Sequence, residues 1–324
     1  MAPSKQERPV LLGALLFCSP ICDSVYNPRM NRRTFLETSI ATAVLTSLPS
    51  KSFAATHQIE KVGVQLYSVR DLMKSDFEGT IAKVAAIGYK EVEFAGLFNH
   101  SPNHVRAILD KDGLTAPSAH VGYDIVEKQW PETIEAAKIM GQSYIVCPWI
   151  PDEARKQPDG YKRIAELFNK AGEASNKAGI SFAYHNHTWE FEPSPLLGGK
   201  RPYDFLLDST DPKLCNMEMD LCWAAVAGQD PVSYFNRYPG RFPLVHVKDM
   251  QKLPKPSDGN TVLTKLDTLE ADMTDVGSGV IDWKKIFASA DKAGIKHFIV
   301  ENDWPKDALA SLTNSYNYLS KLRF

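Results

Sequence analysis

The chain has 324 residues, a formal net charge of −2 and 44% hydrophobic residues, a globular composition large enough for one large domain or two smaller ones. The near-neutral charge gives no reason to expect a nucleic acid or an anionic membrane as partner. Its five cysteines form neither a disulfide framework nor a zinc-type CxxC pair, so we expect buried free thiols.

Residues 1–55 are predicted to be an N-terminal extension that carries an export signal. A twin-arginine pattern at 31–36 is followed by a short apolar stretch at 40–48 and a small-residue cleavage site at Ala54. Met30 is the preferred natural start. The alternative is a Sec signal beside a chance Arg-Arg pair. Either signal predicts a periplasmic protein, and the apolar stretch is too short to span a membrane in the mature form.

From residue 57 onward, strand-like and helix-like segments alternate along the chain. Short apolar runs predict eight strands, at 62–68, 91–94, 116–121, 144–147, 181–185, 216–219, 244–247 and 298–301. Apolar residues at three- and four-residue spacing predict helices at 77–87, 104–111, 131–140, 161–178, 203–207, 231–238, 283–293 and 307–322. Four of these helices end at a glycine, which can adopt the left-handed conformation that stops a helix: Gly88, Gly141, Gly179 and Gly294.

Eight strand-helix units over residues 56–324 predict a single-domain α/β protein with the (β/α)8 TIM-barrel fold. A doubly wound open sheet is the alternative, but no GxGxxG or P-loop opens the first unit. Two long loops, at 192–202 and 251–279, follow the fifth and seventh strands. They are therefore expected on the face of the barrel that carries active sites, where they could cover the site.

Polar side chains gather where the predicted strands end. In chain order these are Gln65, Tyr67, Glu93, His120, Trp149, His185, His187, Asp220, His246, Lys248 and Glu301. In a barrel they converge above the axis. Burying Asp220, His246 and Glu301 without partners would be costly, and a shared cation would offset that cost. Imidazoles combined with carboxylates predict one divalent ion, Mn, Co, Zn or Fe, with Mg less expected.

Simpler explanations exist for several of these residues. His120 could be a hydrogen-bonded strand-end residue, Glu93 a salt-bridge partner and Lys248 a solvated lysine. Glu218 is expected to pack near the site or support it, not to bind the metal directly.

Five segments in this order resemble the xylose-isomerase-like TIM-barrel superfamily, and within it bacterial proteins labelled sugar phosphate isomerase/epimerase. They are GVQLYSVRD (63–71), YHNHTWEF (184–191), MDLCWAAVAG (219–228), VHVKD (245–249) and GSGVIDW (277–283). The resemblance implies one metal held by Glu, Asp, His and Glu from strands five to eight. Asp220, His246 and Glu301 match the last three ligands, and His185 stands where the first glutamate is expected.

The resemblance implies a metal-dependent isomerase or epimerase that removes a proton next to a carbonyl and passes through a metal-stabilised enediolate. Glu301 is then the expected base, His185 or Glu93 acts on the other side, and Lys248 donates to the oxyanion. His120, His187, Trp149, Gln65 and Tyr67 are expected to bind a small carbohydrate. A homodimer is left open.

Other functions are also considered. The first alternative is a periplasmic lyase or hydrolase that cleaves 3-keto-glycosides by β-elimination, because that reaction needs one base and one acid. The second is a sugar-binding barrel without catalysis. An abasic-site endonuclease would need further zinc ligands, and Trp223 stands where such enzymes place a histidine.

Overall fold

The computed structural model describes residues 57–254 and 269–324. The predicted export signal and residues 255–268 of the second long loop lie outside this range. In the part of the chain that is described, no helix is both long and apolar enough to cross a membrane. Its three cysteines, Cys147, Cys215 and Cys222, are buried and unpaired, as expected.

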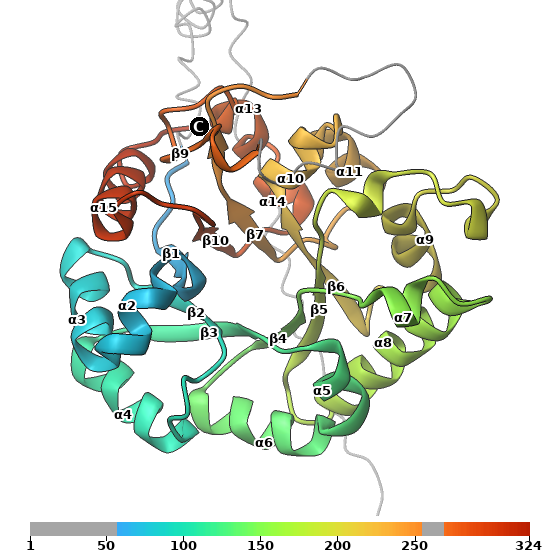
Figure 1. Cartoon of the computed structure of the whole chain (residues 1–324), viewed down its shortest axis with the longest axis horizontal. Helices are drawn as coiled ribbons and strands as arrows, with labels where there is room; N and C mark the ends of the chain where they lie inside the picture. The colour runs from blue at the N-terminus through green and yellow to red at the C-terminus, as the bar shows by residue number, and fades with distance from the viewer. Residues whose placement is uncertain (1–56, 255–268) are drawn as a thin grey trace, which may run out of the picture. The chain divides into compact units, whose positions relative to one another are not determined.

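Eight parallel strands close into a barrel in the order β1-β10-β7-β6-β5-β4-β3-β2, seen end-on in Figure 1. The strands are β1 (Val62–Gln65), β2 (Glu91–Ala95), β3 (Thr115–His120), β4 (Tyr144–Cys147), β5 (Ser181–His185), β6 (Cys215–Asp220), β7 (Leu244–Val247) and β10 (His297–Val300). Each corresponds to one predicted strand, so the predicted TIM barrel is confirmed.

Helices form a ring around the barrel (Figure 1). Seven predicted helices are present, as α3 (Phe77–Ile87), α4 (Pro102–Asp112), α6 (Trp130–Met140), α8 (Gly160–Asn176), α9 (Pro202–Ser209), α11 (Pro231–Arg237) and α15 (Ala308–Leu319). The helix predicted at 283–293 is instead two pieces, α13 (Trp283–Phe287) and α14 (Ala290–Ala293). Four short helices were not predicted: α2 (Arg70–Ser75), α5 (Tyr123–Lys128), α7 (Asp152–Arg155) and α10 (Leu221–Val226).

The first strand is shorter than predicted. It ends at Gln65, because the Gln65 side chain accepts a hydrogen bond from the Tyr67 amide and begins the 3-10 turn η1 (Leu66–Val69). The helix-ending glycines are as predicted, since Gly88, Gly141, Gly179 and Gly294 all have φ between 72° and 125°.

The inside of the barrel is filled by a small apolar cluster of Tyr144, Val146, Ala183, Leu244 and Ile299. Alternate strand residues point to the same side. The next inward positions after Ala183, Leu244 and Ile299 are therefore the polar residues His185, His246 and Glu301. The polar site accordingly lies directly above an apolar plug.

A second, antiparallel pair of strands, β8 (Asp249–Met250) and β9 (Met273–Thr274), follows β7. The buried Asp249 carboxylate accepts hydrogen bonds from the amides of Gly277, Gly279 and Ile281 and from Nε1 of Trp283. This carboxylate therefore joins the VHVKD segment to the GSGVIDW segment.

Candidate metal centre and active site

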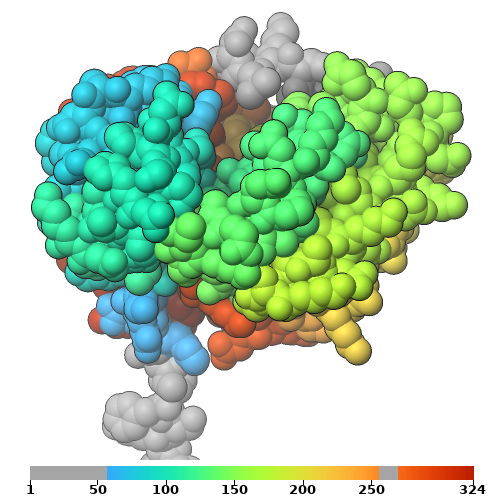
Figure 2. All heavy atoms as spheres, turned by 90° about the horizontal axis from the view of Figure 1, so that it is seen from below, coloured from blue at the N-terminus to red at the C-terminus, as the bar shows by residue number. Residues whose placement is uncertain are grey.

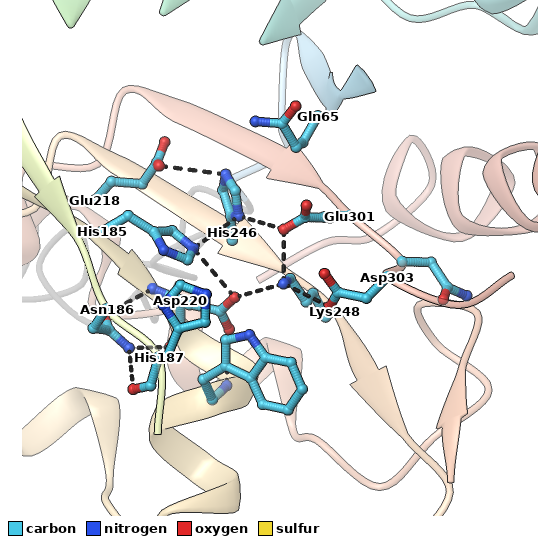
Figure 3. A network of polar contacts seen from close by, with 12 residues as sticks. Gln65, His185, Asn186, His187, Glu218, Asp220, His246, Lys248, Glu301 and Asp303 are labelled. Atoms are coloured by element: carbon cyan, nitrogen blue, oxygen red, sulfur yellow. Dashed lines mark hydrogen bonds and ion pairs between the residues drawn. The ribbon is translucent and has the colours of Figure 1, made fainter. Parts of the chain in front are cut away.

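Four donor side chains meet at the carboxyl ends of β5, β6, β7 and β10 (Figure 3). One ligand atom from each of His185, Asp220, His246 and Glu301 lies within 4.8 Å of the others, and all four residues are buried. His185 Nε2 is 3.2 Å from His246 Nδ1 and 3.5 Å from Asp220 Oδ2. His246 Nδ1 is 2.8 Å from Glu301 Oε2. The structure thus brings together the four side chains predicted as ligands.

These donors fit a divalent cation. Two imidazole nitrogens that face each other at 3.2 Å need a proton or a cation between them, and a cation would satisfy both lone pairs. Asp220 Oδ1 caps α10 by accepting the Trp223 amide at 2.8 Å. Its Oδ2 makes no hydrogen bond of good geometry, although Lys248 Nζ lies 3.0 Å away. Two nitrogens and two carboxylate oxygens suit Zn, Mn, Co or Fe.

Lys248 adds a buried positive charge beside these ligands. Its Nζ lies 2.7 Å from Glu301 Oε2 and 2.8 Å from Asp303 Oδ2. Burial alone would lower the pKa of Lys248, but Asp220, Asp303 and Glu301 outweigh burial and raise that pKa well above its usual value. Burial would raise the pKa of Glu301, but Lys248 and His246 lower it well below the usual range. Without metal, the pair is therefore an ammonium and a carboxylate at neutral pH.

A second polar cluster lies beneath the first and shares His246 with it. His246 Nε2 is 2.8 Å from Glu93 Oε1, and His120 Nε2 is 2.7 Å from Glu218 Oε2. Gln65 Nε2 donates to Glu93 Oε1 at 2.7 Å. When one ring nitrogen of a histidine binds a metal, a carboxylate that is hydrogen-bonded to the other nitrogen fixes the tautomer and the orientation of the ring. Burial and the neighbouring Glu93 charge raise the pKa of Glu218 to about 7.

This lower cluster could also accommodate a cation by distance alone, since its four ligand atoms lie within 4.8 Å of one another. Its two imidazole nitrogens already pair with carboxylate oxygens, however, at 2.7 Å and 2.8 Å, and Glu93 and Glu218 are fully buried. Its geometry is that of a support for His246 and His120.

A cavity of about 880 Å³ lies over the upper cluster. Its polar part is lined by His120, His185, His187, Lys248, Glu301 and Asp303. Four aromatic residues also line it: Tyr67, Trp149, Trp223 and Trp304. A substrate in this cavity would therefore meet the predicted ligands from one side and aromatic rings from the others.

The other predicted site residues divide into two groups. His120, His187, Trp149 and Tyr67 line the cavity, where they can contact a substrate. Gln65 and Glu93 are fully buried, do not line the cavity, and form the hydrogen bonds beneath His246. A direct contact of either one with substrate stays a prediction that this placement does not favour.

Sequence reasoning missed two residues that support the loop after β5. Asn186 Oδ1 accepts the Asp220 amide at 3.1 Å and so ties β5 to β6. The buried Glu190 carboxylate accepts hydrogen bonds from the Tyr184 hydroxyl at 2.6 Å and the His187 amide at 2.9 Å. Burial raises the pKa of Glu190 to about 7. The only sequence signal was their position inside the YHNHTWEF segment.

The chain is similar in sequence to inosose dehydratases from several bacteria. An inosose dehydratase from Lacticaseibacillus casei is 25% identical over 246 residues, which cover 69% of this chain and 80% of that protein. An inosose dehydratase from Geobacillus thermodenitrificans is 24% identical over 268 residues, which cover 76% of this chain and 87% of that protein.

Two solved structures show the same fold. A sugar phosphate isomerase/epimerase from Parabacteroides distasonis has a TM-score of 0.66 and 25% identity, and the match covers 84% of this chain and 97% of that one. The IolI protein with a bound zinc atom has a TM-score of 0.60 at 13% identity, covering 79% of this chain and 95% of that one, a likeness in fold alone.

These relatives indicate an enzyme, and both an isomerase/epimerase and a lyase fit the matches. A model of one family, described as the xylose isomerase-like TIM barrel, matches residues 81–320. On this match, and in agreement with its closed eight-stranded barrel, the chain belongs to the xylose isomerase-like TIM barrel family.

Proposed function

We propose that the protein is a divalent-metal-dependent lyase that removes a proton next to the carbonyl of a cyclic keto-sugar and expels a group from the β-carbon. The observation that carries this proposal is that the two carboxylates lining the cavity at the metal centre lie on one side of it, whereas the third carboxylate that lines it, Glu132, is exposed on the opposite wall. Glu301 and Asp303 both line it, both follow β10, and both contact the same Lys248 ammonium, at 2.7 Å and 2.8 Å.

In the described chain, no buried carboxylate lines the side of the cavity opposite Glu301. Glu93 and Glu218 are sealed beneath the cavity. Glu132 also lines the cavity, but it is exposed on α6, in the outer ring of helices. Epimerisation by two carboxylates needs a base on each face of the substrate. An elimination needs one base and one proton donor, which this site supplies on one side.

Bound by His185, Asp220, His246 and Glu301, a divalent cation would supply a Lewis acid that polarises the carbonyl and makes the neighbouring C–H more acidic. The Glu301 carboxylate is the candidate to accept that proton. The electron pair of the broken C–H bond then forms the C=C bond as the bond from the β-carbon to the leaving oxygen breaks. Lys248, beside Glu301, can donate the proton that converts the leaving oxygen to water or an alcohol.

The relatives support this reaction, because a dehydratase expels water by elimination, and two of them carry that name. The second candidate is a sugar isomerase or epimerase, which the similarity to the Parabacteroides distasonis protein favours. A 3-keto-glycoside is one substrate that the proposed elimination could use. Action in the periplasm stays a proposal that depends on the twin-arginine pattern at residues 31–36.

The test is to incubate metal-loaded protein in deuterated water with an inosose, a 3-keto-glucoside and a free ketohexose. Release of water or alcohol with a new enone absorbance supports the lyase. Deuterium in an intact epimeric sugar, without any elimination product, would replace the lyase by the epimerase. Glu301→Gln should abolish turnover, whereas Glu173→Gln, on the surface of α8, should not. Full activity of Glu301→Gln would contradict both mechanisms.

A further inference from the structure

We infer that the cavity holds a second subsite, for a flat apolar ring attached to the reacting sugar. Its wall is formed by Leu97, Val121, Ile125, Ala136 and Trp149, on the side of the cavity that β2, β3, β4, α5 and α6 provide. The identification of this ring as part of the leaving group rests on the proposed elimination. The presence of the subsite does not.

The two sides of the cavity differ in chemistry. On the metal-centre side, β5, β7 and β10 present His185, Lys248 and Glu301. On the opposite side, Leu97, Val121, Ile125 and Ala136 are neither buried nor fully exposed. The polar side chains that line the cavity there, along α5 and α6, are the exposed Gln129 and Glu132, and Thr133, whose hydroxyl already donates to the Gln129 carbonyl at 2.7 Å. A sugar ring needs hydrogen-bonding partners around its edge, and this wall offers few. An apolar ring would instead remove the wall from water, which is favourable.

Trp149 is exposed and yet fixed in place. It keeps 43% of its surface exposed, and Tyr67 keeps 42%. Of the five exposed large hydrophobic residues in the described chain, these two line the cavity and Ile139, Leu196 and Val280 do not. An aromatic surface left open inside a pocket is typical of a ligand contact.

The surroundings of Trp149 hold its indole rigidly. The ring stands edge-on to His187 and Trp189, with centroids 5.0 Å and 5.8 Å apart. The Arg155 guanidinium lies 3.9 Å from the centre of the Trp189 ring and 5.4 Å from that of Trp149. A ring that is already fixed loses little conformational entropy when a ligand stacks on it. Contact with His187 also places Trp149 where the polar part of the cavity meets the apolar part.

The size of the cavity agrees with two rings. Its volume of about 880 Å³ is near the upper end of the roughly 300–1,000 Å³ found for small-molecule pockets, whereas one sugar ring is much smaller. Figure 2 shows the surface hollowed between the teal segment around α4 and the green segment that contains α5 and α6. Residues from both segments, Leu97 and Ile125 among them, line the cavity.

The test compares binding of phenyl and methyl β-glucoside to metal-loaded protein by calorimetry. Neither glucoside has a carbonyl, so neither can undergo the proposed elimination. We expect the phenyl compound to bind roughly tenfold more tightly, a ratio typical of one well-buried apolar group. Trp149→Ala should remove this preference by deleting the platform, and Ala136→Trp by filling the space. Ala136→Trp should leave methyl glucoside binding unchanged, because Ala136 belongs to the apolar wall and not to the polar part of the cavity.

Ile139→Ala is the matched control, because Ile139 is exposed on α6 but lies outside the cavity lining. It should keep the phenyl preference. Equal affinities in the wild type, no binding of either glucoside, or a preference that survives both cavity variants would overturn the subsite. A protein that shows the preference but eliminates nothing would keep the subsite and refute the proposed lyase.

Discussion

Replacing Glu190 by glutamine should make the protein more stable at alkaline pH and slightly less stable at acidic pH. The Glu190 carboxyl is fully buried, and its pKa is raised by burial to about 7 from an ordinary value of 4.5. Glutamine has nearly the same shape and can still accept the His187 amide and bond to the Tyr184 hydroxyl. It cannot ionise.

The direction of the pH dependence is set by whether the folded or the unfolded state binds the proton of Glu190 more tightly. Below pH 4.5 both the folded and the unfolded carboxyl are protonated, so Glu190 contributes no pH dependence there. Between pH 4.5 and about 7 only the folded state keeps the proton, so stability falls as pH rises. Above pH 7 the cost is complete at roughly 3 kcal/mol. Glu190→Gln avoids this cost and loses about 1 kcal/mol of hydrogen bonding at all pH values.

The assay is urea unfolding of chelator-treated protein, followed by circular dichroism at pH 5 and pH 8. The difference in unfolding free energy between Glu190→Gln and the wild type should rise by roughly 2.5 kcal/mol from pH 5 to pH 8. Tyr184→Phe is the control, because it removes a hydrogen bond that lowers the pKa of Glu190 and so keeps the pH dependence of the wild type or steepens it. A difference between Glu190→Gln and wild type that does not change with pH would refute the reasoning.

Three further changes test other parts of the structure. His185→Ala should weaken Zn²⁺ binding at least roughly tenfold in a competition assay with a chromophoric chelator, whereas His187→Ala should not, and equal weakening would remove His185 from the ligand set. Asp249→Ala should lower the free energy of unfolding by roughly 3 kcal/mol or more, because several buried N–H groups lose a charged acceptor; a loss under about 1 kcal/mol would show that Asp249 is not the anchor of this loop. Gly172→Ala should cost roughly 1–3 kcal/mol, because a Cβ there would lie 2.0 Å from the Leu214 carbonyl oxygen, and an unchanged melting temperature would contradict that packing.

The barrel was predictable because each of its signals is local. Strands buried on both faces appear in the sequence as short apolar runs, and glycines mark the ends of helices that precede them. The missed elements lack such signals. α5 and α10 have six residues each, too few for a helical period to show. The first strand was predicted to reach Ser68 because Leu66 and Tyr67 continue its apolar run, whereas the Gln65 side chain accepts a hydrogen bond from the Tyr67 amide and so turns the chain.

The residues of the site were predictable from the sequence, but the height of each residue along the barrel axis was not. Alternation along each strand shows which side chains point inward, but their height depends on the stagger between strands. His246 on β7 pairs with Asp220 on the neighbouring strand β6 and with Ile299 on the other neighbouring strand, β10. Glu301 therefore lies two residues farther along the chain than the β10 partner of His246, whereas Glu93 does not line the cavity and contacts His246 Nε2. Asn186 and Glu190 were missed because their roles are contacts to neighbouring strands and loops.

The Asp249 carboxylate and the β8–β9 pair also determine how the chain re-enters the barrel. The Gln251 amide donates to the Asp272 carbonyl at 2.7 Å, and Asp249 accepts the Gly277 amide at 2.9 Å. The chain that leads into β10 is thus held against the end of β7. His246 lies on β7, and Glu301 directly follows β10. One buried carboxylate outside the metal centre therefore links the placement of two metal ligands that lie far apart in the sequence.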